Sequence, residues 1–203
     1  MLKENCLNEG YYEISKLGNI LLIIIISVCM FLVPIFVPTA LNAVFGAEST
    51  IANNSQIVVG AIVNTTLVMS AISVRGWKNI VALITVPSIS ALTSGLVLSV
   101  ASIFTVYMIP AIWIGNLLLV YAIKSIYVKH NKNFVLASSI GICGKALIIF
   151  AGFNLLTLLV SMPEHVQMVL TTAMGVNQVI TAILGCAIAY GITKVMFPNN
   201  KNN

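Results

Sequence analysis

Long apolar stretches fill most of the chain, and short polar segments separate them. A helix that crosses the ~30 Å hydrocarbon core of a bilayer needs about 20 apolar residues, because each residue advances ~1.5 Å. The stretches have this length, so they predict an all-α membrane protein built as a bundle of six transmembrane helices. The predicted helices are Gly18–Pro38, Gln56–Val74, Asn79–Leu98, Ile103–Tyr127, Phe134–Ser161 and Thr171–Phe197.

The third predicted helix differs from the others, because it contains Pro87 and many serine and threonine residues. A proline removes one backbone hydrogen bond, and the carbonyl group that it frees must find another partner. We therefore expect this helix to be bent or broken.

Basic residues mark one side of this layout. Nine of the ten lie on the same side as both termini, whereas Glu48 and Glu164 lie on the other side with no lysine or arginine. This positive-inside pattern predicts a multi-pass protein of the cell membrane. Residues 1–17 would form a cytoplasmic N-terminal segment, residues 18–197 the transmembrane domain and residues 198–203 a cytoplasmic tail. The nine basic residues are Lys3, Lys16, Arg75, Lys78, Lys124, Lys129, Lys132, Lys194 and Lys201.

The composition argues against several functional classes. Of the 203 residues, 59% are hydrophobic and only 7% are charged, which is too few charges for a soluble domain. The net charge of +5 comes from residues at helix ends, so it indicates topology and not nucleic-acid binding. The four cysteines are scattered, and no catalytic motif or intramembrane carboxylate occurs. We expect neither an enzyme nor a metal or cofactor site.

Lys145 is the one basic residue away from the predicted cytoplasmic side, in the middle of the fifth helix. A lysine near the bilayer centre costs at least ~2.5–3.5 kcal/mol. At 100° per residue it lies at the edge of a face of small residues that includes Gly141 and Gly152, which predicts that it points into the bundle. Because no acidic residue lies in a predicted span, Lys145 is a candidate functional residue.

Two interpretations of Lys145 remain open at this point. In the structural one, burial keeps the lysine neutral, or its amine donates to backbone carbonyls near Gly141 or Pro87. In the functional one, it binds an anionic group of a ligand, such as a carboxylate, and uncharged polar side chains orient that ligand. Such side chains often only bond to a neighbouring helix, and a tryptophan more often packs than stacks on a ligand. The candidate ligand-binding residues are Lys145, Asn64, Asn116, Asn154, Asn177, Gln178 and Trp113.

Two local segments carry a resemblance to a known family. The segment Val59–Thr66 followed by Arg75–Lys78, and the segment Tyr107–Asn116, look similar to clostridial-type membrane proteins placed near that family. With its short, apolar six-helix architecture and no energy source of its own, the chain resembles the S components of bacterial energy-coupling factor (ECF) transporters. These are substrate-binding membrane subunits. The resemblance implies a small ligand captured from outside, a transmembrane scaffold subunit and two cytoplasmic ATPases as partners.

Three functions follow from these observations. The first is a substrate-binding subunit of a multi-subunit importer for a small anionic solute, such as a vitamin or its precursor. The second is a non-transporting assembly or regulatory membrane protein, whose Lys145 pairs with an acidic residue of a partner helix. The third is a self-sufficient facilitator, but the two three-helix halves show no convincing inverted repeat. In each case the lipid bilayer surrounds the protein, and no nucleic acid is expected as a partner.

Overall fold

The computed structural model describes residues 15–94 and 102–196. Within these ranges the chain is helical and contains no strand. The rest of the predicted layout, including residues 1–14, residues 95–98 of the third helix and the tail, lies outside the described residues. The elements are α1 (Lys16–Phe45), α2 (Thr50–Asn53), α3 (Ser55–Ser73), α4 (Trp77–Ser94), α5 (Ser102–Ala122), the π-helix η2 (Ile123–Lys129), α6 (Phe134–Leu159), α7 (Glu164–Met174) and α8 (Val176–Met196).

Five helical stretches of the described chain are long and apolar enough to cross a membrane. This confirms the prediction of an all-α protein with the helices of a membrane protein. The described part of α4, Trp77–Ser94, is not among the five. It nevertheless packs against α1, α3 and α5. The five stretches are Lys16–Phe45, Ser55–Ser73, Phe104–Lys129, Phe134–Leu159 and Glu164–Val195.

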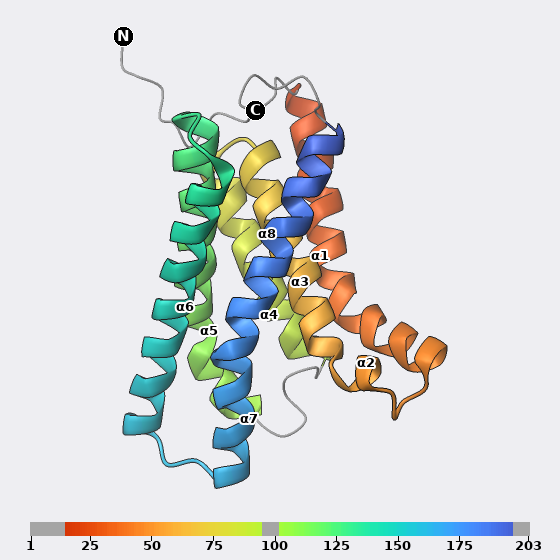
Figure 1. The fold of residues 1–203 in the computed structure, drawn as a ribbon, viewed down its shortest axis with the longest axis vertical. Helices are drawn as coiled ribbons and strands as arrows, with labels where there is room; N and C mark the ends of the chain where they lie inside the picture. Colours follow the sequence, from red (N-terminus) through yellow and green to blue (C-terminus); the bar gives the residue numbers. More distant parts are fainter. Residues whose placement is uncertain (1–14, 95–101, 197–203) are drawn as a thin grey trace.

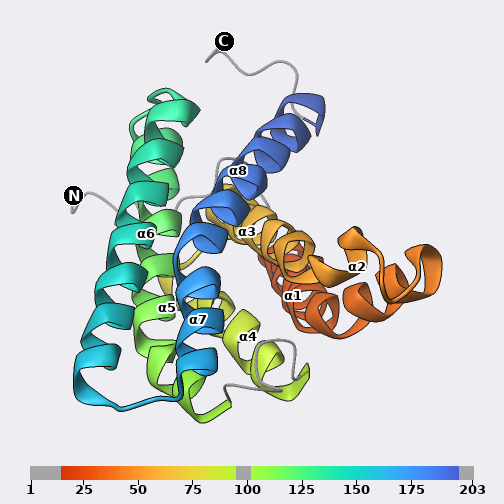
Figure 2. The same cartoon turned by 60° about the horizontal axis from the view of Figure 1, so that its bottom comes forward.

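The long helices run side by side along the long axis of the molecule (Figure 1). The closest pairs are α5 with α6 and α3 with α8. Figure 2 shows α7 and α8 between the α5–α6 pair and the α1–α3 pair. The short helix α2, the helix α7 and the α6–α7 connection lie at one end of the bundle, and the first turns of α1 and α6 lie at the other.

Two predicted helix boundaries are wrong, and one expected break is absent. The first helix continues through Pro38 to Phe45, because a proline interrupts one hydrogen bond of the helix and not the whole ladder. For the same reason α4 continues through Pro87 without the expected break. The sixth predicted helix, Thr171–Phe197, is instead divided at Gly175, whose backbone angles of φ −97° and ψ −106° are not helical.

Small residues allow the two closest helix pairs to approach each other. A Cβ atom on Gly152 of α6 would lie 2.6 Å from the Cβ of Ala111 on α5. A Cβ atom on Gly60 of α3 would lie 2.7 Å from Cγ2 of Thr181 on α8. Both distances are too short for real side chains, so these approaches require glycine. Association of helices in lipid depends on such packing, because lipid tails are as apolar as the helix surfaces.

Lys124 has a position that the sequence did not reveal. Its side chain was expected at a solvated helix end, but it is fully buried. Its Nζ donates hydrogen bonds to the carbonyl oxygens of Val74, at 2.7 Å, and Ala71, at 3.2 Å. These carbonyls lie at the C-terminal end of α3, where a cation interacts favourably with the helix dipole. Lys124 therefore fastens α5 and η2 to the end of α3.

The packing of α5 on α6 predicts opposite effects for two neighbouring glycines. A Cβ on Gly141 would lie 3.1 Å from the backbone Cα of Leu119, whereas a Cβ on Gly144 would reach Leu118 only at an ordinary 3.5 Å. We expect Gly141→Ala to lower stability by about 1–3 kcal/mol through overpacking. Gly144→Ala should leave stability unchanged or raise it, because alanine favours the helix. Thermal unfolding in detergent would test this difference, and equal melting temperatures would contradict the packing.

Candidate functional site

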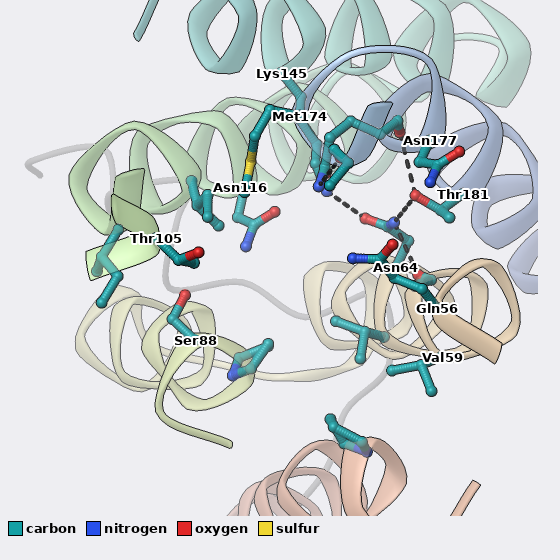
Figure 3. Close-up of a pocket in the computed structure, with 18 of the residues that line it drawn as sticks. Gln56, Val59, Asn64, Ser88, Thr105, Asn116, Lys145, Met174, Asn177 and Thr181 are labelled. Carbon is teal, nitrogen blue, oxygen red and sulfur yellow. Dashed lines mark hydrogen bonds between the residues drawn. The ribbon is translucent and has the colours of Figure 1, made fainter. Parts of the chain in front are cut away.

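A cavity of about 140 Å³ lies inside the bundle, between α1, α3, α4, α5, α6 and the α7–α8 pair. Figure 3 shows polar side chains from several of these helices directed into it. Its size is close to that of an engineered cavity of ~150 Å³ that holds one benzene molecule. The lining residues are Pro34, Gln56, Val59, Gly60, Val63, Asn64, Pro87, Ser88, Leu92, Thr105, Ile109, Ile112, Asn116, Lys145, Ala173, Met174, Asn177, Gln178 and Thr181.

Lys145 reaches this cavity from the middle of α6. Gly141 and Lys145 are both buried, which confirms that Lys145 points into the bundle. Only 3% of Lys145 is exposed. Its Nζ donates a hydrogen bond of 2.6 Å to Oδ1 of Asn64 on α3. The backbone carbonyls near Gly141 and Pro87, which were the expected structural partners, are not used.

Asn64 connects Lys145 to a third helix. Its Nδ2 donates to the hydroxyl oxygen of Thr181 on α8, at 3.2 Å, and to the carbonyl oxygen of Gly60, at 2.9 Å. Figure 3 shows this chain of hydrogen bonds along one wall of the cavity. The carboxamide of Asn64 is therefore held in one orientation, with its oxygen toward the lysine. We call Lys145, Asn64 and Thr181 the lysine relay.

The lysine relay depends on the close approach of α3 and α8. A Cβ atom on Gly185 would lie 2.8 Å from the backbone nitrogen of Thr65, so only glycine fits there. Thr65 also donates to the carbonyl oxygen of Gly185, at 3.3 Å. Gly60 and Gly185 thus set the distance at which Asn64 meets Thr181. Sequence reasoning missed both residues, because nothing in the sequence pairs α3 with α8.

No carboxylate neutralises Lys145 in the described part of the chain. The acidic residues of the described chain are Glu48 and Glu164. Both are exposed, and neither lines the cavity. A charged lysine has three N–H donors, and the described residues supply an acceptor for one of them. The charged amine would therefore give the cavity a positive charge and free donors, which suit an anionic or strongly accepting group.

A second polar wall of the cavity comes from α4 and α5. Ser88 Oγ and Asn116 Oδ1 are buried and have no hydrogen-bond partner among the described residues. Both residues line the cavity, as does Thr105 beside them (Figure 3). Buried polar atoms in proteins almost always have a partner, so two unpartnered atoms on one cavity indicate a place for another molecule.

The division between α7 and α8 supplies a third part of the lining. Gly175 is required there, because a Cβ would lie 2.7 Å from the carbonyl oxygen of Thr171. Nε2 of Gln178 donates to the carbonyl oxygen of Ala173, at 3.3 Å, and so satisfies one group exposed by the break. Discontinuous helices at a binding site are common in membrane transporters.

The structure brings five of the seven predicted site residues to the cavity: Lys145, Asn64, Asn116, Asn177 and Gln178. It does not bring Asn154 or Trp113 there. Asn154 lies on another face of α6, where its Nδ2 donates to the carbonyl oxygen of Phe150 at 2.7 Å, and Trp113 is 37% exposed on α5. Ser88 and Thr105 were not predicted, since serine and threonine are frequent in these helices and carry no distinguishing signal.

Comparison of the chain with protein-family models, curated proteins and solved structures gives no match. The site is therefore interpreted from its own chemistry.

The bond between Lys145 and Asn64 should be measurable as a coupling energy. Asn64→Leu leaves the buried amine without its acceptor, so it should destabilise the protein more when Lys145 is present than in a Lys145→Met background. We expect a coupling of about 1.5–3 kcal/mol, the range for hydrogen bonds to charged groups. Denaturant unfolding of the two single variants and the double variant gives this value. Asn154→Leu is the matched control, and additive effects of Asn64→Leu and Lys145→Met would contradict the bond.

Proposed function

We propose that this protein is the substrate-binding membrane subunit of an ECF-type multi-subunit importer, and that its solute is small and anionic, such as a vitamin or its precursor. It would be a multi-pass protein of the bacterial cell membrane without catalytic activity of its own. The observation that carries the proposal is a buried lysine on a small cavity, where its acceptor among the described residues is the neutral amide of Asn64.

The arrangement of the helices supports an outward-facing site. In the proposed topology α4 is a further span, which brings the total to six, and both termini are cytoplasmic. The ends that carry Lys16, Arg75 and Lys129 lie at one end of the bundle in Figure 1, and α2 and α7 lie at the opposite end. The cavity residues Gln56 and Gln178 belong to the first turns of α3 and α8, which begin toward that opposite end. A solute would therefore enter from outside, and the positive-inside rule sets this direction.

The partners follow from the absence of an energy source in the chain. With no nucleotide-binding motif in the sequence, the energy for import would come from cytoplasmic ATPases, joined through a transmembrane scaffold subunit. Exposed apolar side chains along α1, among them Ile20, Ile24 and Val28, are available to lipid or to such a scaffold.

The burial of Lys145 argues against the assembly or regulatory alternative. A lysine that pairs with an acidic residue of a partner helix must reach the outer surface of its own bundle. Lys145 instead points to the interior and is 3% exposed. A partner's carboxylate could approach it only if a helix entered the bundle, whereas a small solute needs only the cavity.

Lys145→Met is expected to abolish binding of the solute and to preserve the fold. The methionine retains the length and apolar character of the stem but removes the amine that attracts the anion. Mass spectrometry of small molecules retained by the purified protein identifies the solute, and equilibrium binding then compares the variants. We expect a loss of at least ~100-fold, as for hydrogen-bonded charges in buried sites.

Lys194→Met is the matched control, because Lys194 is exposed near the end of α8 and away from the cavity. It should bind the solute as the unchanged protein does. Unaltered binding in Lys145→Met would remove the anchor role. Co-purification of ATPases and a scaffold subunit would support the importer, whereas a stable partner with an intramembrane carboxylate would support assembly.

A further inference from the structure

The second polar wall gives information about the solute that the lysine relay alone does not. Three buried side-chain atoms lack a hydrogen-bond partner among the described residues, and two of them, Asn116 Oδ1 and Ser88 Oγ, line the cavity. The third, Nε of Arg75, is not on the cavity lining. Asn116 is 3% exposed and Ser88 is 7% exposed, so neither side chain can rely on bulk solvent.

The chemistry of these two side chains indicates which group of a solute would bind them. A carboxamide presents an acceptor oxygen beside a donor NH₂ group, and a hydroxyl group both donates and accepts. The best partner for an asparagine side chain is therefore an edge that carries an N–H donor next to an acceptor. Asparagine pairs with adenine in this bidentate way in nucleic-acid recognition.

The remaining lining limits the size and shape of the solute. The cavity is also lined by apolar side chains, including Val63, Ile109, Ile112 and Met174. Its volume of about 140 Å³ is close to that of a cavity that holds one six-membered ring. A ring-sized cavity with apolar lining and two groups of polar side chains suits a planar ring that carries two polar edges.

We infer that the solute is a single-ring heterocyclic carboxylate. Its carboxylate would bind Nζ of Lys145, and an amide-like donor–acceptor edge elsewhere on the ring would bind Asn116 and Ser88. The inference rests on the proposed function, since it uses the same cavity and the same anionic anchor. It adds the requirement for a second recognition edge, which a simple anion lacks.

Three probes separate the two ends of the site. Orotate has a carboxylate and, across the ring, an N–H group flanked by two carbonyl groups. Benzoate retains the carboxylate on a ring without that edge, and uracil retains the edge without the carboxylate. We expect orotate to bind the full-length purified protein at least ~10-fold more tightly than either of the others, because each lacks one recognition edge.

Asn116→Leu tests the assigned residue. It should weaken orotate binding at least ~10-fold and leave benzoate binding unchanged, whereas Lys145→Met should weaken both. Asn154→Leu, on the outer face of α6, should change neither. Because Asn116 Oδ1 makes no bond within the described protein, the melting temperature of solute-free Asn116→Leu should not fall. A lower melting temperature would show that Asn116 has a hydrogen-bond partner within the protein, and it would overturn the inference.

The outcomes distinguish this inference from the proposed function. Equal affinities for orotate and benzoate would contradict the second recognition edge, and so would an equal effect of Asn116→Leu on the two affinities. In both cases the role of Lys145 as the anionic anchor would remain supported. If uracil binds as tightly as orotate and Lys145→Met changes neither affinity, the proposal of an anionic solute is contradicted. The second recognition edge would then remain supported. If none of the three probes binds, the heterocyclic carboxylate is overturned, whereas the proposed function is tested separately with the solute that mass spectrometry identifies.

Discussion

The hydrogen bond from Lys145 to Asn64 joins α6 to α3 at a place where an amine has no other described acceptor. In an apolar bundle an amine without a partner is far more costly than one in water, so this contact is a specific link between the two helices. Asn64 can serve because Thr181 and the carbonyl oxygen of Gly60 hold its carboxamide in one orientation. The relay thus ties three helices together around one nitrogen atom.

Glycine makes this geometry accessible. The helices α3 and α8 meet closely at Gly60 and Gly185, and α5 and α6 meet closely at Gly152. The two close pairs leave the space between them unfilled, and the cavity lies there. Its walls differ in character: the lysine relay offers a strong donor, whereas Asn116 and Ser88 offer unpartnered polar atoms. A cavity with such walls is costly to keep empty, and this cost is the physical argument for a bound molecule.

Much of the candidate site could be predicted from depth along each helix. Asn64, Asn116, Asn177 and Gln178 were predicted from their depth in apolar spans, and Lys145 from the cost of its charge. Asn154 lies at a suitable depth but on another face of α6, and Trp113 is directed toward the outside of α5. Depth can be counted in residues, but the face that a polar side chain occupies depends on where the neighbouring helices pack. Lys124 shows the same limit, since its burial on α3 required knowing that α3 ends beside it.

The sequence by itself determined the all-α class, because its long apolar stretches have the length and composition of helices that can cross a membrane. It also determined that Lys145 is exceptional, since the cost of a buried amine does not depend on the arrangement of the helices. Only the tertiary structure decided that the partner is Asn64, that Ser88 and Asn116 lack partners, and that the last helix is divided at Gly175. These features depend on contacts between residues far apart in the chain, which helical periodicity cannot encode.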